Sequence, residues 1–284
     1  MSTAAAPASR TPHGWAGGPV TFGGVLRSEW IKTATVPSTV ILLAVSFVVM
    51  VGLGALVAWG LVQLASDPEN GPPQGIGQSL QSAAYDVPAS GLPFGQLLIA
   101  ALAVVLIGSE YTTGMIRSTM VAVPTRIPAL LAKTLVIAVV SFLLGILAAF
   151  TTYLLAQPIL AGSDLDFGLD AEWVLPSILN TGTVLALIAV MGVAIGALLR
   201  NTAGGVVTLV GALFVLPIIA SLLNGLADWV EDAARFLPSS AAAQLVATQI
   251  QPDAFNQVEG GLILAGWAVV LLAAAMVALR KRDV

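Results

Sequence analysis

The feature of this sequence that most constrains its fold is a series of six apolar runs, each close to the thickness of a lipid bilayer. A helix needs about 20 mostly apolar residues to cross the hydrocarbon core. The runs lie at residues 38–64, 93–107, 128–156, 173–199, 203–223 and 261–279. Because 57% of the residues are hydrophobic and only 9% are charged, we predict an all-α polytopic membrane protein with six transmembrane helices in a domain of residues 38–284.

The basic residues lie mainly on one side of this six-span plan. That side receives 10 of the 11 Lys and Arg residues: Arg10, Arg27, Lys32, Arg117, Arg126, Lys133, Arg200, Arg280, Lys281 and Arg282. The positive-inside rule makes this side the cytoplasm. We therefore predict a multi-pass protein of the plasma membrane with both termini in the cytoplasm. Lys133 lies near the inner end of its helix, and we expect its side chain to extend to the interface.

Two segments precede the first run. Residues 1–19 are rich in Pro, Gly, Ala and Ser and are predicted to be a disordered tail. Residues 20–37 have apolar side chains at near-helical spacing and charged side chains between them, which predicts a helix lying in the cytoplasmic interface. The residues that we assign to this interfacial helix are Phe22, Leu26, Arg27, Glu29, Trp30 and Lys32. An ordinary juxtamembrane anchor is the alternative.

A second short amphipathic region lies before the last run, in "LADWVEDAARFLPSSAAAQLVATQI". It predicts one helix that ends near Phe236 and another that begins after the break at Pro238. Both are too short and too polar to span the bilayer. We expect a re-entrant helix pair that enters the membrane from outside.

Within the six runs, the sequence places no Asp, Glu or Arg. Proton-coupled and ion-coupled transporters generally need ionisable groups at depth. The milder polar residues of the fourth run, Asn180, Thr181 and Thr183, are candidate pathway-lining residues. Hydrogen bonding between helices is the alternative role for them.

Several classes of chemistry lack the residues that they need. There is no Cys, and the one His is His13 in the tail. We predict no metal site and no catalytic set, so the chain is not expected to be an enzyme by itself. A basic face at the inner leaflet is explained by membrane lipids, and nothing in the sequence requires nucleic acid as a partner.

The most unusual polar segment follows the second run and reads "GSEYTTGMIRSTMVAVPTR", residues 108–126. The second run is short, since 15 residues rise only about 23 Å, and we expect its helix to continue into flanking polar residues. Together with "LRSEWIKTATVPST" before the first run and the broken helix pair before the sixth, this segment resembles the ABC type-2 permease family. The resemblance covers nearly all of the chain after about Val20.

The resemblance implies a type-V ABC exporter fold and a role as the membrane-spanning permease subunit of an ATP-driven transporter. It also implies a second permease subunit and two separate ABC ATPase subunits that bind Mg-ATP. In that family the loop after the second span holds a coupling helix that docks on the ATPase. The residues that match this position are Glu110, Tyr111, Thr112, Gly114, Met115 and Arg117.

Two other functions remain open at the level of sequence. One is an ATP-independent channel or secondary transporter, against which the lack of ionisable residues within the runs counts. The other is a membrane anchor or sensor module for another protein. A solvated inner turn is the corresponding alternative for residues 108–126.

The predicted orientation is testable because the natural chain contains no Cys. Single cysteines at positions 70, 166 and 256 should react with a membrane-impermeant maleimide in intact cells. Cysteines at positions 118 and 282 should react only after permeabilisation. Labelling of position 118 from outside would reverse the orientation.

Overall fold

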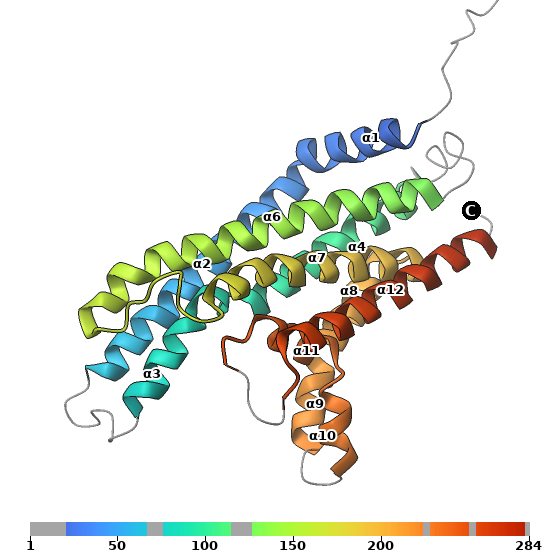
Figure 1. Ribbon diagram of the computed structural model, residues 1–284. Coiled ribbons are helices and arrows are strands. Elements are labelled where there is room, and N and C mark those ends of the chain that lie inside the picture. Colours follow the sequence, from blue (N-terminus) through green and yellow to red (C-terminus); the bar gives the residue numbers. More distant parts are fainter. Residues whose placement is uncertain (1–20, 67–75, 115–126, 224–227, 250–253, 282–284) are drawn as a thin grey trace, which may run out of the picture.

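The computed structural model of the chain describes residues 21–66, 76–114, 127–223, 228–249 and 254–281. All the regular elements in these ranges are helices (Figure 1). Six helical stretches are long and apolar enough to cross a membrane. The predicted all-helical, six-span architecture of a multi-pass membrane protein is therefore confirmed. The tail at 1–19 lies outside the described residues.

The spans agree with the apolar runs to within a few residues, except for the second. In chain order they are α2 (Pro37–Ala65), α4 (Leu92–Thr112), α6 (Ile127–Leu160), α7 (Val174–Leu199), the composite of α8 (Thr202–Val210), η3 (Gly211–Val215) and α9 (Leu216–Leu223), and α12 (Gln257–Lys281). As expected from its short apolar run, α4 continues into polar residues and ends at Thr112. The 3₁₀ turns η1 (Val87–Ala89) and η2 (Ala161–Ser163) flank α4 and α6.

The described residues also include four shorter helices: α1 (Phe22–Thr35), α3 (Ile76–Tyr85), α10 (Asp228–Ala234) and α11 (Pro238–Val246). Pro238 occupies the first turn of α11, where its missing N–H is harmless. The predicted pair of short helices is thus present as α10 and α11, and its re-entry into the bilayer stays a prediction. We call the end of the bundle that carries α1 and the end of α12 the α1 end, and the opposite end the α3 end (Figure 1).

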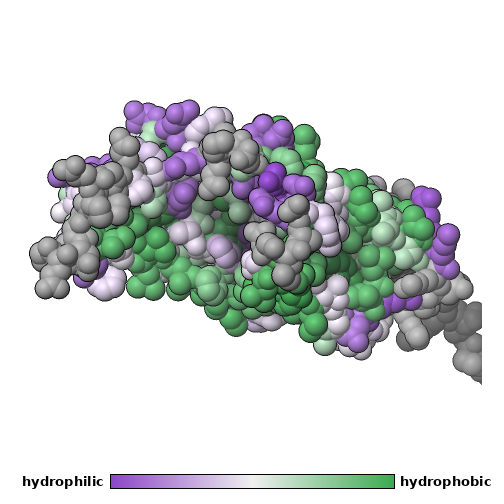
Figure 2. All heavy atoms as spheres, turned by 90° about the horizontal axis from the view of Figure 1, so that it is seen from below, coloured by the Kyte–Doolittle hydropathy of each residue, from purple (hydrophilic) through white to green (hydrophobic). Residues whose placement is uncertain are grey.

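The fourth span, α7, is the central helix of the bundle. It packs against α4, α6 and α12, and its side chains Leu185, Ile188 and Met191 are almost completely buried. The first and fifth spans instead bury few of their residues, and Val207 and Leu222 of the fifth span are 71% and 74% exposed. In Figure 2 a largely hydrophobic surface separates hydrophilic residues over the α3 end from those at the opposite extreme, as expected of a membrane-embedded bundle.

Close packing between α4 and α7 depends on glycine. A Cβ atom added at Gly192 would lie 2.6 Å from the Cβ of Ala103, and one at Gly196 would lie 2.3 Å from Cγ2 of Ile107. These distances are too short for real Cβ contacts. The G-x-x-x-G pair of the fourth span therefore lets the two backbones approach each other, the usual role of this spacing in membranes.

Gly196→Leu should disrupt the contact of α4 with α7, because the core there has no room for a side chain. Overpacking of this kind costs about 1–3 kcal/mol. The measurement is the apparent melting temperature of the detergent-solubilised protein. Gly266→Leu on α12 is the matched control, since a Cβ there would meet nothing within 4 Å. An equal fall in melting temperature for the two variants would contradict the role of Gly196 in close packing.

Candidate functional site

Four charged side chains from three helices meet at the α1 end, and we call them the ionic cluster: Glu29 and Lys32 of α1, Glu110 of α4 and Lys133 of α6. Lys133 Nζ donates to Glu29 Oε2 and, at 2.9 Å, to Glu110 Oε1. Lys32 Nζ lies 2.7 Å from Glu29 Oε1 and 3.2 Å from Glu110 Oε1. Each carboxylate therefore contacts both ammonium groups, and the cluster is neutral overall.

The sequence of α1 sets one face of this helix against the bundle. Val25, Glu29 and Thr33 are buried, and because they recur every four residues they share a face. Val25 packs in a small hydrophobic group with Ala129 and Ala132 of α6. The small alanine side chains let α1 approach α6 closely, which brings Glu29 within reach of Lys133.

The other two members are positioned by the ends of their helices. Glu110 lies in the last turn of α4, which ends near Gly114 in the left-handed conformation with φ of 73°. Glycine adopts this conformation without steric cost and commonly stops helices. Lys133 lies six residues into α6, about 9 Å from its start. Both side chains are thereby held at the same level of the bundle.

Three of the four members are almost removed from solvent. The side chains of Glu29, Glu110 and Lys133 are 4%, 7% and 9% exposed, and that of Lys32 is 31% exposed. A buried charge is tolerated only when it is paired and hydrogen-bonded. Loss of one partner from such a group typically costs about 3–5 kcal/mol, because it leaves an uncompensated buried charge. The cluster consequently fixes how α1 sits on α4 and α6.

The cluster also shifts the titration of the two α1 residues. Burial raises the pKa of Glu29, but attraction to Lys133 and hydrogen bonds from Lys133 and Lys32 outweigh it, so the pKa lies below the ordinary value of 4.5. Burial lowers the pKa of Lys32, but its hydrogen bond to Glu29 and the charge of Glu110 raise it above the ordinary 10.5. Both groups are therefore charged across the neutral range.

A second contact holds the end of α4 from another direction. The guanidinium carbon of Arg200 lies 5.5 Å from the centre of the Tyr111 ring, a cation–π distance. Arg200 is the residue after α7 and has a left-handed backbone with φ of 52°. Glu110 and Tyr111 are adjacent and contact different helices. The last turn of α4 is thus fixed to α1, α6 and the α7–α8 junction.

The structure gives the surroundings of several residues that were named from the sequence. Lys133, which was expected to extend to the interface, is buried and paired with both Glu29 and Glu110, and its depth in a membrane stays a prediction. Glu110, named for the coupling position, is 6% exposed and paired with Lys32 and Lys133. Thr112 is exposed and its hydroxyl donates to Gly108 O within α4. Met115 and Arg117 lie outside the described residues.

Helix α1 (Phe22–Thr35) lies within the predicted residues 20–37, and its location in the membrane interface stays a prediction. Phe22 and Trp30 are 47% and 49% exposed, Arg27 is also exposed and Leu26 is half-buried. The side that contacts α6 and α4 carries the ionic cluster instead. Sequence reasoning missed this set, although Lys133 is the one basic residue within a long apolar run, which signals a need for carboxylate partners.

The candidate pathway-lining residues have structural hydrogen bonds. Asn180 Nδ2 donates to Leu245 O at 2.9 Å and to Gln257 Oε1 at 3.1 Å, which links α7 to α11 and α12. The hydroxyl groups of Thr181 and Thr183 each donate to the carbonyl oxygen four residues earlier. These contacts favour the alternative role, in which Asn180 connects helices.

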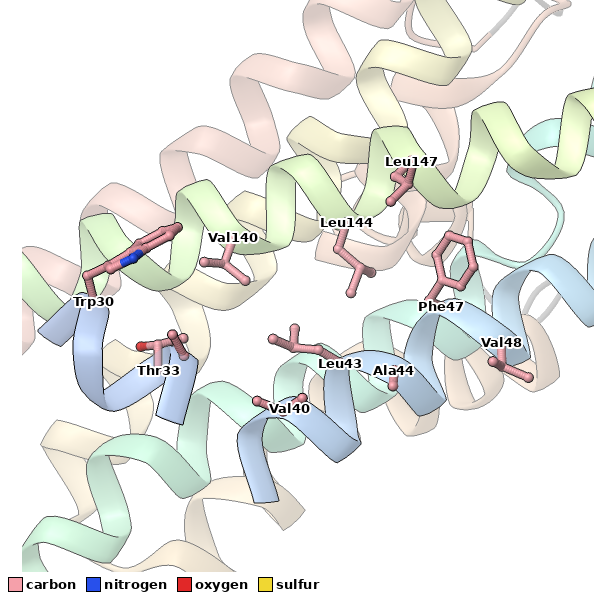
Figure 3. A pocket seen from close by; sticks show the side chains of 11 residues that line it. Trp30, Thr33, Val40, Leu43, Ala44, Phe47, Val48, Val140, Leu144 and Leu147 are labelled. Atoms are coloured by element: carbon pink, nitrogen blue, oxygen red, sulfur yellow. The ribbon is translucent and has the colours of Figure 1, made fainter. Parts of the chain in front are cut away.

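An apolar groove of about 490 Å³ runs between the α1–α2 elbow and α6 (Figure 3). Trp30 closes one end, Phe47 and Leu147 lie toward the other, and Leu43 and Leu144 face each other across it. The elbow itself is made by Val36 and by Pro37, the first residue of α2. The groove therefore separates the elbow from this part of α6.

No protein-family model matches the chain, and no curated protein matches it.

The pKa shift of Glu29 predicts acid sensitivity. A lowered pKa stabilises the fold fully above pH 4.5, and the contribution is lost as the pH falls through the lower folded pKa. The apparent melting temperature should fall between pH 7 and pH 3 in the wild type, and less steeply in Glu29→Gln. Glu231→Gln, at an ion pair whose carboxylate side chain is 61% exposed, should retain the wild-type slope. An identical dependence of melting temperature on pH in all three proteins would refute the lowered pKa of Glu29.

Proposed function

We propose that this chain is the membrane-spanning permease subunit of an ATP-driven ABC transporter, an exporter that works with separate ATPase subunits. The observation that carries the proposal is the ionic cluster. It joins an N-terminal helix outside the spans to the two helices that border residues 115–126. An energy input at this end of the bundle would therefore move α1, α4 and α6 together.

A permease without its own ATP site needs a stiff attachment point for its motor. The last turn of α4 meets this requirement, because Glu110 fixes it to α1 and α6 while Tyr111 contacts Arg200. In the proposal, Glu110 and Tyr111 position the coupling segment. Thr112 and Gly114, both exposed, with Met115 and Arg117, supply the surface for the ATPase.

The same arrangement indicates which helices would move together. When the ATPase subunits bind Mg-ATP and close, the coupling segments approach each other, and the rigid unit of α1 with the adjoining ends of α4 and α6 moves with them. Rigid-body rotation of packed elements is a common form of such switching. The α1 end is cytoplasmic in this scheme, and the protein lies in the plasma membrane with both termini inside.

The outer surfaces of the bundle leave room for a second permease subunit. The first and fifth spans bury few of their own side chains, and apolar residues such as Val207, Ile218 and Leu222 are strongly exposed. Lipid covers such surfaces in a monomer. In the proposal, part of them contacts the second subunit, and the remainder contacts membrane lipids.

The protein purified in mild detergent from its own membrane should retain an ABC ATPase in equal stoichiometry. Glu110→Gln and Gly114→Leu should each weaken ATPase retention or substrate-stimulated ATP hydrolysis about tenfold or more. The first variant removes one partner from the buried ionic cluster, a loss that typically costs about 3–5 kcal/mol. The second places a side chain on a left-handed residue.

Glu172→Gln is the matched control, because this exposed carboxylate lies just before α7 at the opposite side of the membrane in the proposed topology. It should leave retention and hydrolysis unchanged. Absence of any ATPase partner would favour a channel, a secondary transporter or an anchor. Full ATPase retention and hydrolysis in both variants would show that the segment after α4 is only a turn.

A further inference from the structure

A second cavity lies toward the α3 end, among the α3–η1 region, α2, α4, η3 and α11. Its volume of about 350 Å³ is within the range of small-molecule sites. Its lining includes Asp86, Leu92, Gln96, Leu213, Phe214, Ser239 and Ala243. None of them belongs to the ionic cluster or to the groove beneath the α1–α2 elbow.

The walls combine apolar surfaces with a few polar groups. Leu92, Leu213 and Phe214 are among the apolar residues that line it. Gln96 lies one turn into α4 and is 5% exposed. The Ser239 hydroxyl oxygen is buried and has no hydrogen-bond partner among the described residues. An unsatisfied buried hydroxyl is costly, and a polar ligand atom in the cavity would satisfy it.

Asp86 gives the cavity its charge. Its Oδ1 accepts from the Thr248 hydroxyl at 2.6 Å and from the Thr248 backbone N–H at 3.2 Å. These two bonds fix the carboxylate, and a carboxylate has acceptor sites to spare. Among the described lining residues none is basic. The local field therefore favours a positively charged or hydrogen-donating ligand.

The fifth span departs from α-helical geometry where it lines this cavity. Gly211–Val215 form a π-helical turn that includes Leu213 and Phe214. Pro217 follows closely, and a proline ring clashes with the carbonyl four residues earlier, here that of Leu213. A wider turn relieves that clash. Short π-helical turns are frequent at functional sites.

We propose that this cavity binds a small amphipathic cation, with its apolar body against Leu213 and Phe214 and its amino or ammonium group toward Asp86. Gln96 and Ser239 accept or donate the remaining hydrogen bonds. The claim that such cations are the transported substrates rests on the proposed function. The claim that the cavity binds them depends on the cavity alone.

The test is a binding titration on the purified full chain in nanodiscs, without nucleotide or ATPase. The probe is ethidium, a fluorescent apolar cation with two amino groups, and anilinonaphthalene sulfonate is the anionic comparison. Asp86→Asn keeps an acceptor for Thr248 but removes the charge, and should weaken ethidium binding about tenfold or more. Ala243→Phe should abolish binding by filling the cavity. Asp166→Asn, an exposed carboxylate outside the cavity, should bind as the wild type does.

Three results would overturn the site: no saturable ethidium binding by the wild type, equal affinity for the anionic dye, or unchanged binding in both cavity variants. Melting temperatures of the variants separate a lost site from a lost fold, and Gln96→Leu, with an expected weakening of severalfold, provides a second variant. Because no ATPase takes part, a negative result here leaves the proposed function standing. Absence of an ATPase partner would likewise leave the cavity standing.

Discussion

Charges cannot remain buried at the end of an apolar bundle unless they neutralise one another, and this requirement determines the arrangement of the α1 end. Glu29 and Glu110 each contact Lys32 and Lys133, so removal of any one member leaves an unbalanced charge. Apolar packing tolerates small sliding movements, whereas an ion pair in a low-dielectric region depends strongly on distance. The position of α1 relative to α4 and α6 is consequently well defined, although its apolar contacts are few.

The rest of the bundle is held by different forces. Glycine-mediated contact joins α7 to α4 and to α6, where a Cβ at Gly145 would lie 2.7 Å from the Cα of Gly182. Toward the α3 end, Ser177 and Asn180 of α7 donate to carbonyl oxygens at the end of α11. The central helix is thus tied by close packing along its length and by hydrogen bonds at one end. Movement imposed at the α1 end would pass along α4 and α6 to this central helix.

The sequence predicts the spans well because hydrophobicity over about 20 residues is a local property. It also places α1 correctly, since side-chain periodicity is local too. The ionic cluster was missed because its members lie up to 104 residues apart, and no local rule pairs Glu29 with Lys133. The hydrogen bonds of Asn180 could not be predicted for the same reason, since its partners in α11 and α12 are distant in the sequence. The end of α4 is also a local property: the short apolar run predicts the extension through Glu110, and the residue type of Gly114 indicates a helix end.

The π-helical turn at Gly211–Val215 has a consequence for the surface of the fifth span. A turn of this kind accommodates one residue more than an α-helical turn, which changes the angular phase of everything beyond it by about 100°. Side chains before the turn, such as Val207, and after it, such as Leu222, therefore do not continue a single helical stripe. The lipid or protein that covers this span therefore contacts two helical segments whose side chains follow different angular series.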